Sequence, residues 1–226
     1  MTIQEMHNGI AIELDKSGSL TYPSFLPSEI DYWLNAAQLK KVKDTLFGSR
    51  SNPTNATNST SNIEDLRTLL TVVSYQPLNA IAGYENFGSV DINSNLLHLN
   101  EAIFKVNSSG DEFRTSRINP MDKLNYLSSP NNKPWIENPL SFIENDKLTL
   151  VIDPVEYNTG VVSMSNYSAL YSYYKIPSDV DLGTSTDSEL PDSLHQEIVE
   201  LAANMMLENI ESPRFPNNTQ LINDTL

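Results

Sequence analysis

The spacing of the hydrophobic residues changes twice along the chain, and this change constrains the fold more than any other feature. In residues 3–14 and 30–46, apolar side chains recur every three or four positions, the period of one helical face. From about residue 75 they form short runs between Gly, Asn and Pro, which is typical of strands. The helical period then returns at Leu194, Ile198, Leu201, Ala202 and Met205. We therefore predict an α+β fold: N-terminal helices and a C-terminal helix around a small, mostly antiparallel β region with long loops.

We expect a single domain, residues 1–226, built from four parts. Residues 1–74 are the helical part, with helices near 2–14, 28–47 and 63–73 and a polar, low-complexity loop at 49–62. Residues 75–190 are the β region. Its expected strands are 90–92, 102–106, 148–152, 161–164 and 169–176, with a short helix near 119–127. A C-terminal helix at 191–211 and a polar tail at 212–226 complete the chain.

Composition excludes several classes of protein. The chain has no Cys, which excludes disulfide scaffolds and thiolate metal sites. Its formal net charge of −15 argues against binding to nucleic acid or to an anionic membrane surface, since both need surplus Lys and Arg. No stretch approaches the ~18 apolar residues of a membrane span. The first residues have neither a basic nor an apolar region, so we expect no secretory signal.

No motif predicts a catalytic or cofactor site. The three histidines, His7, His98 and His195, lack the spacing of a metal site, and we expect them at surface or capping positions, with His98 in a polar loop. The chain has neither a nucleophile elbow nor a phosphate-binding glycine loop. We therefore predict no enzymatic activity, no metal and no cofactor. Because carboxylates are plentiful, a small hydrolase that uses paired acids stays an alternative hypothesis.

The negative charge is concentrated near the C-terminus, with nine acidic residues and no basic one between Lys175 and Arg214. Three interpretations are open for this band: a solvated face, a docking surface for a basic partner, or the lining of a channel that repels DNA. The acidic residues that we assign to it are Asp179, Asp181, Asp187, Glu189, Asp192, Glu197 and Glu200.

Two apolar stripes on the 28–47 segment suggest that this helix contacts neighbours on two sides. Together with the polar loop and the polar tail, it is expected to form an interface between chains. The residues that we assign to this interface are Trp33, Val42, Leu46, Asn55, Asn58, Phe215 and Leu221.

The order of several segments resembles a known family. The first is Met-Thr-Ile-Gln-Glu-Met at the N-terminus, followed by the helix that begins Pro-Ser-Glu-Ile-Asp-Tyr-Trp and ends in Lys-Lys-Val-Lys at residue 43. Residues 119–134, 139–150 and 173–182 follow, and then Leu-Pro-Asp-x-x-His-x-x-Ile-Val from residue 190. In this order the chain resembles the head–tail connector, or ring, proteins of tailed bacteriophages, most closely those of crAss-like short-tailed phages.

The resemblance implies a structural virion protein without enzymatic activity, assembled in the host cytoplasm. Such proteins form rings of about twelve copies that join the portal to the tail and surround the genome-exit channel. The implied partners are other copies of the chain, the portal and other ring or tail proteins. DNA would pass through without specific binding, and no membrane is involved. The 49–62 loop is longer and more polar than the family pattern, and we interpret it as an arm that reaches a neighbouring subunit or another ring.

A second hypothesis treats the β region as a carbohydrate- or receptor-binding module of a phage tail or capsid. Its ligand would contact aromatic side chains, for which the sequence offers Tyr171, Tyr173, Tyr174 and Trp135. Such a module would expose these tyrosines together in one groove.

Overall fold

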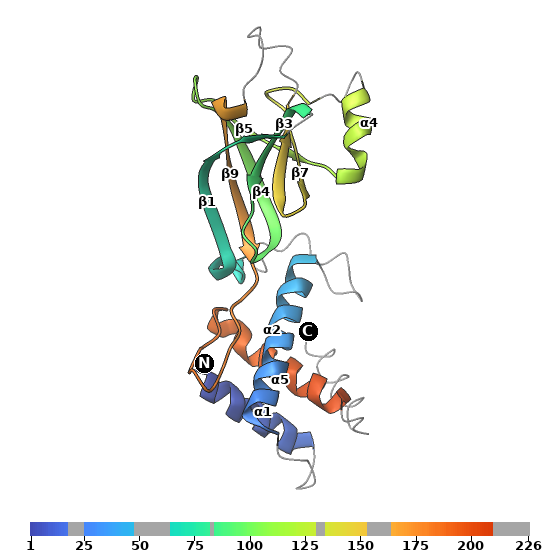
Figure 1. Ribbon diagram of the computed structural model, residues 1–226. Coiled ribbons are helices and arrows are strands. Elements are labelled where there is room, and N and C mark those ends of the chain that lie inside the picture. The colour runs from blue at the N-terminus through green and yellow to red at the C-terminus, as the bar shows by residue number, and fades with distance from the viewer. Residues whose placement is uncertain (18–24, 48–63, 82–83, 130–133, 153–163, 210–226) are drawn as a thin grey trace. The chain divides into compact units, whose positions relative to one another are not determined.

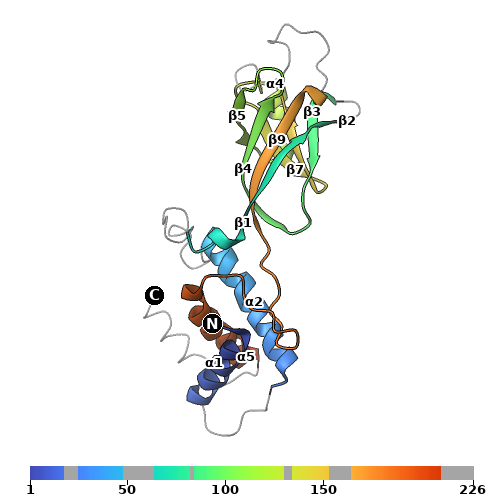
Figure 2. The same ribbon diagram turned by 90° about the vertical axis from the view of Figure 1, so that its left-hand side faces the viewer.

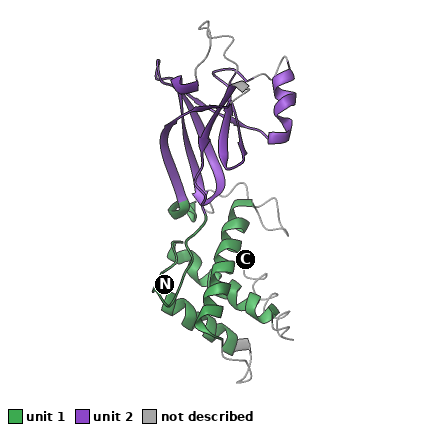
Figure 3. Cartoon of the chain, in the orientation of Figure 1, with its two compact units in different colours: residues 1–69, 176–226 green, residues 70–175 purple. Residues whose placement is uncertain are grey.

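The computed structural model describes residues 1–17, 25–47, 64–81, 84–129, 134–152 and 164–209 (Figure 1). It confirms the α+β class. The chain divides into two compact units where we expected one domain: residues 1–69 with 176–226, and residues 70–175 (Figure 3). Residues 176–190, which we had assigned to the β region, therefore belong with the helices.

The helical unit contains α1 (Ile3–Ser17), α2 (Pro27–Phe47) and α5 (Asp192–Asn209), and α5 packs against both of the others. Helix α1 buries the predicted stripe of Ile3, Met6, Ile10 and Leu14. Gly9 allows a close approach of α1 to α5, because a Cβ atom at this position would lie 3.0 Å from Val199 Cγ1.

The buried face of α5 differs from the predicted stripe. Leu194, Ile198 and Ala202 are buried as expected, whereas Leu201 and Met205 are only partly buried. Because α5 packs against two helices, its buried face is wider than a single stripe. The buried residues of this face are Leu194, His195, Ile198, Val199, Ala202, Ala203, Met206 and Leu207.

The β unit consists of two sheets, seen in two orientations in Figures 1 and 2. The four-stranded sheet has the order β1 (Leu70–Pro77), β9 (Tyr167–Lys175), β4 (Leu96–Val106), β5 (Glu112–Arg114). The five-stranded sheet has the order β2 (Asn79–Ile81), β3 (Tyr84–Asp91), β8 (Lys147–Val151), β7 (Leu140–Glu144), β6 (Ser116–Arg117). All of these strand pairs are antiparallel except β6 with β7.

Two hydrophobic clusters stabilise the β unit. The larger cluster draws on both sheets and includes Phe104, Leu148, Leu150, Tyr171 and Tyr173. The smaller cluster contains Phe87, Ile118, Leu140, Phe142 and Val151, and side chains of α4 (Lys123–Ser128) pack against it. Helix α4 follows the 3₁₀ turn η2 (Pro120–Asp122), so the short helix predicted near 119–127 is confirmed.

Other predicted elements were wrong or incomplete. The helix predicted at 63–73 is replaced by the 3₁₀ turn η1 (Arg67–Leu69) and strand β1. The β-branched run Thr71-Val72-Val73 favours a strand, and its pairing with β9 overrides the helical spacing. Of the strand predicted at 161–164, residues 161–163 lie outside the described residues, and Met164 begins the 3₁₀ turn η4 (Met164–Asn166).

The two ends of the β unit lie beside each other. Leu70, the first residue of β1, pairs with Tyr174 near the end of β9. Paired residues of antiparallel strands have Cα atoms roughly 5 Å apart. The β unit is therefore an insertion whose entry and exit are adjacent.

Candidate functional site

Part of the acidic band helps to hold the helical unit together. At the start of α1, the Ile3 amide donates to the Asp187 carboxylate at 2.6 Å. At the start of α5, Asp192 accepts from the amino group of Met1 at 2.5 Å. This amino group and the nearby His195 lower the pKa of Asp192. On the α5 surface, Glu197 forms an ion pair with Lys41 of α2. Three of the seven acids thus connect separate elements.

The other acids of the band do not converge on one point. Asp181 accepts from the Gly183 amide and from the Thr184 hydroxyl within a tight turn. Glu189 accepts from both the amide and the hydroxyl of Ser178, and Glu200 accepts from Gln196. Asp179 is exposed. In the part of the chain that the structure describes, no three His, Asp or Glu residues are placed to hold a metal ion.

Residues 176–191, here called the connecting segment, are bound by polar side chains of α2. Asn35 donates to the Val180 carbonyl at 3.0 Å and accepts from the Val180 amide at 2.8 Å, so it pairs with both main-chain groups of one residue. Gln38 donates to the Ser178 carbonyl and accepts from the Ser188 hydroxyl. These side chains replace the partners that a neighbouring strand would give this extended backbone.

A third polar side chain of α2, that of Asp31, connects α1 to the connecting segment. Its Oδ1 lies 2.8 Å from His7 Nε2 of α1, and its carboxylate also accepts from the Leu182 amide. Asp31, Asn35 and Gln38 follow one another at spacings of four and three, which places them on one helical face. The sequence therefore held a signal for this contact, which the search for apolar stripes missed.

His7 and His195 lie in the first and last helices, as the sequence predicted, but not at the surface. His7 and His195 are buried. The Nε2 atom of His195 donates to the Leu190 carbonyl at 2.8 Å, which leaves Nδ1 as the acceptor facing the Met1 amino group. His98 lies in strand β4 instead of a polar loop, where burial and then the positive charge of Arg117 lower its pKa.

The aromatic residues proposed for ligand binding are mostly in the interior. Tyr171, Tyr173 and Tyr174 are buried, so the prediction of an exposed tyrosine groove is wrong. The Tyr171 hydroxyl donates to the Asp91 carbonyl, and the Tyr173 hydroxyl donates to Asn95 and accepts from Asn93. These bonds connect β9 to residues 91–95, between β3 and β4. Trp135 is exposed, but it cannot form the proposed groove with tyrosines that lie in the core.

One charged cluster spans strands β1, β4 and β5 of the four-stranded sheet. Lys105 Nζ lies 4.5 Å from the centre of the Tyr75 ring and 3.0 Å from Glu112 Oε1. Partial burial and the hydrogen bond to the Glu112 carboxylate raise the pKa of Tyr75 to about 12. Hydrogen bonds from Tyr75 and Lys105 lower the pKa of Glu112. A phenol with a raised pKa is a poor nucleophile or base at neutral pH, so this cluster favours a structural role.

The residues predicted for an interface have different environments. Trp33 and Leu46 are half-buried, and Trp33 packs edge-to-face against Tyr32. Val42 is fully buried against its own chain, so its assignment to an interface was wrong. Asn55, Asn58, Phe215 and Leu221 lie outside the described residues, together with the 49–62 loop and the 212–226 tail.

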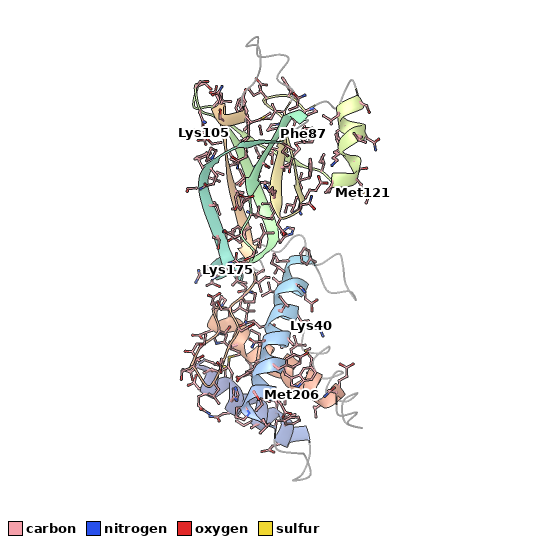
Figure 4. The ribbon with its side chains drawn as sticks, in the orientation of Figure 1. Lys40, Phe87, Lys105, Met121, Lys175 and Met206 are labelled. Carbon is pink, nitrogen blue, oxygen red and sulfur yellow. The ribbon has the colours of Figure 1, made fainter. Side chains whose placement is uncertain are left out.

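Several large apolar side chains that the sequence analysis did not select lie on the surface. Met121 is 88% exposed and Leu124 is 68% exposed, one helical turn apart; Met121 is labelled in Figure 4. In the helical unit, Tyr32 is 65% exposed and Leu26 is 62% exposed. Contiguous apolar patches mark protein–protein contact sites, whereas single exposed apolar side chains occur on most protein surfaces.

None of the helices that the structure describes is long and apolar enough to cross a membrane. Comparison with known proteins adds no assignment. No protein-family model matches the chain, and no curated protein matches its sequence.

Proposed function

We propose that the chain is a structural subunit of a ring in the head–tail connector of a tailed bacteriophage, as the order of its segments suggests. In this role the virion is its place of action, and it joins the portal to the tail around the genome-exit channel. The observation that best supports a multi-sided contact role is the exposure of apolar side chains on both compact units, including Tyr32, Val72 and Met121. A subunit in a stack of rings has neighbours beside it, above it and below it, and needs contact residues on several faces.

Fewer acids of the acidic band are free to face a channel than the sequence suggested. Asp187, Asp192 and Glu197 are engaged within the chain, so they are not a free wall of charge. Asp179 and Glu200 have no described cationic partner, and in a ring they would repeat in every subunit. Only such outward acids would repel DNA that passes along the axis.

Native mass spectrometry and electron microscopy of the purified chain test the proposal. We expect closed rings of about twelve copies, because a contact that uses two different faces closes when its rotation divides a full circle. A chain that remains monomeric at every accessible concentration would contradict the proposal. Binding of an oligosaccharide to the monomer would favour the binding-module hypothesis instead.

A further inference from the structure

Helix α2 has an outer face that is distinct from the side packed in the helical unit. Its buried side contains Leu34, Ala37, Gln38 and Val42. The opposite side carries Tyr32, Ala36, Lys40 and Lys43 at spacings of four, four and three, here called the α2 outer face. Tyr32, Lys40 and Lys43 are exposed; Lys40 is labelled in Figure 4.

The charge of this face is opposite to that of its surroundings. The sequence of the helical unit is strongly acidic, as is the chain as a whole at −15. Lys41, between the two exposed lysines, is already paired with Glu197. Within the described ranges, neither Lys40 nor Lys43 has an acidic partner. The α2 outer face therefore combines an exposed aromatic ring with two positive charges that no described carboxylate neutralises.

A second surface of the same unit has the complementary charge. On helix α5, Gln196, Glu200, Asn204 and Glu208 follow one another at intervals of four, and we call them the α5 outer face. Glu208 is exposed and Glu200 is half-exposed. The described partner of Glu200 is the neutral amide of Gln196, at 2.9 Å. This face thus offers carboxylates without a described cation.

We propose that the α2 outer face of one subunit docks on the α5 outer face of a second copy of this chain. Opposite charges on the two faces would set the register and speed the encounter, while burial of Tyr32 would contribute apolar contact. The two faces belong to different helices, so the contact is heterologous and can repeat from copy to copy. The inference names the lateral contact of the ring proposed above and rests on that proposal.

Other occupants fit the charges less well. Pairing of two α2 outer faces would gather four lysines in one contact, which like-charge repulsion opposes. Nucleic acid would need many more phosphate contacts than two lysines in an acidic unit supply. A second copy brings the carboxylates that the lysines lack.

A charge-swap experiment with the full chain tests the contact. The variant K40E/K43E makes both faces acidic, and E200K/E208K makes both faces basic. Each variant alone is expected to need at least about a tenfold higher concentration to associate than the wild type, measured by sedimentation and native mass spectrometry. An equimolar mixture is expected to associate at close to the wild-type concentration, with the two variants alternating. This alternation would appear as assemblies with equal numbers of each mass.

The control is R114E/K147E on the β unit, where both side chains are more than half exposed and the change in net charge matches that of K40E/K43E. Circular dichroism first establishes that all variants are folded. Association of K40E/K43E at the wild-type concentration, or failure of folded variants to associate when mixed, would overturn the contact.

The outcomes separate this contact from the ring itself. Closed wild-type rings that persist in K40E/K43E would refute the contact and leave the proposed function intact. Open wild-type oligomers that K40E/K43E dissolves would support the contact and refute the closed ring.

Discussion

Buried polar residues decide how the helical unit is assembled. Every buried side-chain nitrogen or oxygen in the described ranges has a hydrogen-bond partner. His7, Gln38 and His195 are all buried, and each is hydrogen-bonded to a residue outside its own helix. A buried polar group that loses its partner destabilises the fold, whereas an exposed one is solvated by water. Gln38 and His195 therefore fix where the connecting segment lies, and His7 fixes α1 against α2.

Gln38→Ala is expected to lower the free energy of unfolding by about 1–3 kcal/mol. The substitution removes the acceptor of the Ser188 hydroxyl and the donor to the Ser178 carbonyl. Urea denaturation, followed by the helical signal in circular dichroism, measures the change. Gln4→Ala, at an exposed position of α1, is the matched control, and we expect its effect to stay within about 0.5 kcal/mol. Equal effects of the two substitutions would contradict this account of the helical interior.

His98 is expected to make the β unit sensitive to mild acid. Its pKa in the folded chain is lowered from 6.5 by burial and by Arg117. The unfolded chain therefore takes up the proton first, so stability is full above pH 6.5 and falls as the pH drops toward the folded pKa. His98→Asn should remove this part of the pH dependence.

Denaturation of the wild type and His98→Asn at pH 7.5, 6.5 and 5.5 measures this effect. The difference between them should grow in favour of the variant as the pH falls. An NMR titration of the His98 ring gives its pKa directly. Parallel pH profiles for the two proteins would show that His98 is not the group responsible.

At the scale of elements, the sequence predicted those parts whose information is local. The stripe of α1 was predicted because Ile3, Met6, Ile10 and Leu14 are spaced for a helix that packs on one side. Strand β1 was not, because the helical spacing of Leu66, Leu69, Leu70 and Val73 outweighed the β-branched run at 71–73, and the pairing with β9 selects a strand.

The turn between β7 and β8 has a sequence signal that our strand prediction did not use. Asn145 and Asp146 both have positive φ, at 51° and 57°, and form a two-residue hairpin between β7 and β8. Asn and Asp tolerate this conformation better than most residues, so they are typical of such turns. Recognising the turn would have predicted a strand on each side of it.

The contacts of the acidic band could not be predicted from its place in the sequence. The sequence shows where the acids cluster, but the partners of Asp187 and Glu197 come from helices far away along the chain. The same holds for the bonds between Asn35 and Val180, which are 145 residues apart. Such pairings depend on the tertiary fold: the spacing of Asp31, Asn35 and Gln38 shows a polar face on α2, but not which residues that face binds.

Asn35→Ala is expected to loosen the connecting segment without unfolding the helical unit. The substitution frees the Val180 amide and carbonyl together. Hydrogen–deuterium exchange should become faster in residues 178–182 and stay unchanged in the β unit. Asn100→Ala, whose side chain donates to Ser172 in the β unit, is the control and should leave residues 178–182 unaffected. Unchanged exchange at Val180 in Asn35→Ala would contradict the role of Asn35.

At the scale of the whole molecule, the division into two units has the form of one domain inserted into another. The β unit has its own hydrophobic clusters. Its first and last strands are paired, so its ends meet without help from the helices. The helical unit is completed by segments from both sides of the insertion.

Residues 70–175 expressed alone are expected to fold. Their unfolding should be cooperative, because a unit of roughly 100 residues with its own core is large enough to be stable. Calorimetry and NMR of this fragment measure the result. In the reciprocal variant, a short Gly-Ser linker replaces 70–175, since the gap to be bridged is only roughly 5 Å. A fragment without dispersed NMR signals would show that the β unit depends on the helices.

The pairing of Leu70 with Tyr174 also bears on the order in which the chain folds. Helices α1 and α2 are made early during synthesis, yet they pack on α5, which is made last. Closing a loop of roughly 140 flexible residues between α2 and α5 costs about 1 kcal/mol more in chain entropy than closing one of about 40, which is what remains when residues 70–175 are folded. Folding of the β unit shortens the loop between α2 and α5. We therefore expect the β unit to fold first and to speed the docking of α5. The α5 outer face would then become available only after both units are in place, which delays subunit association until each copy is complete.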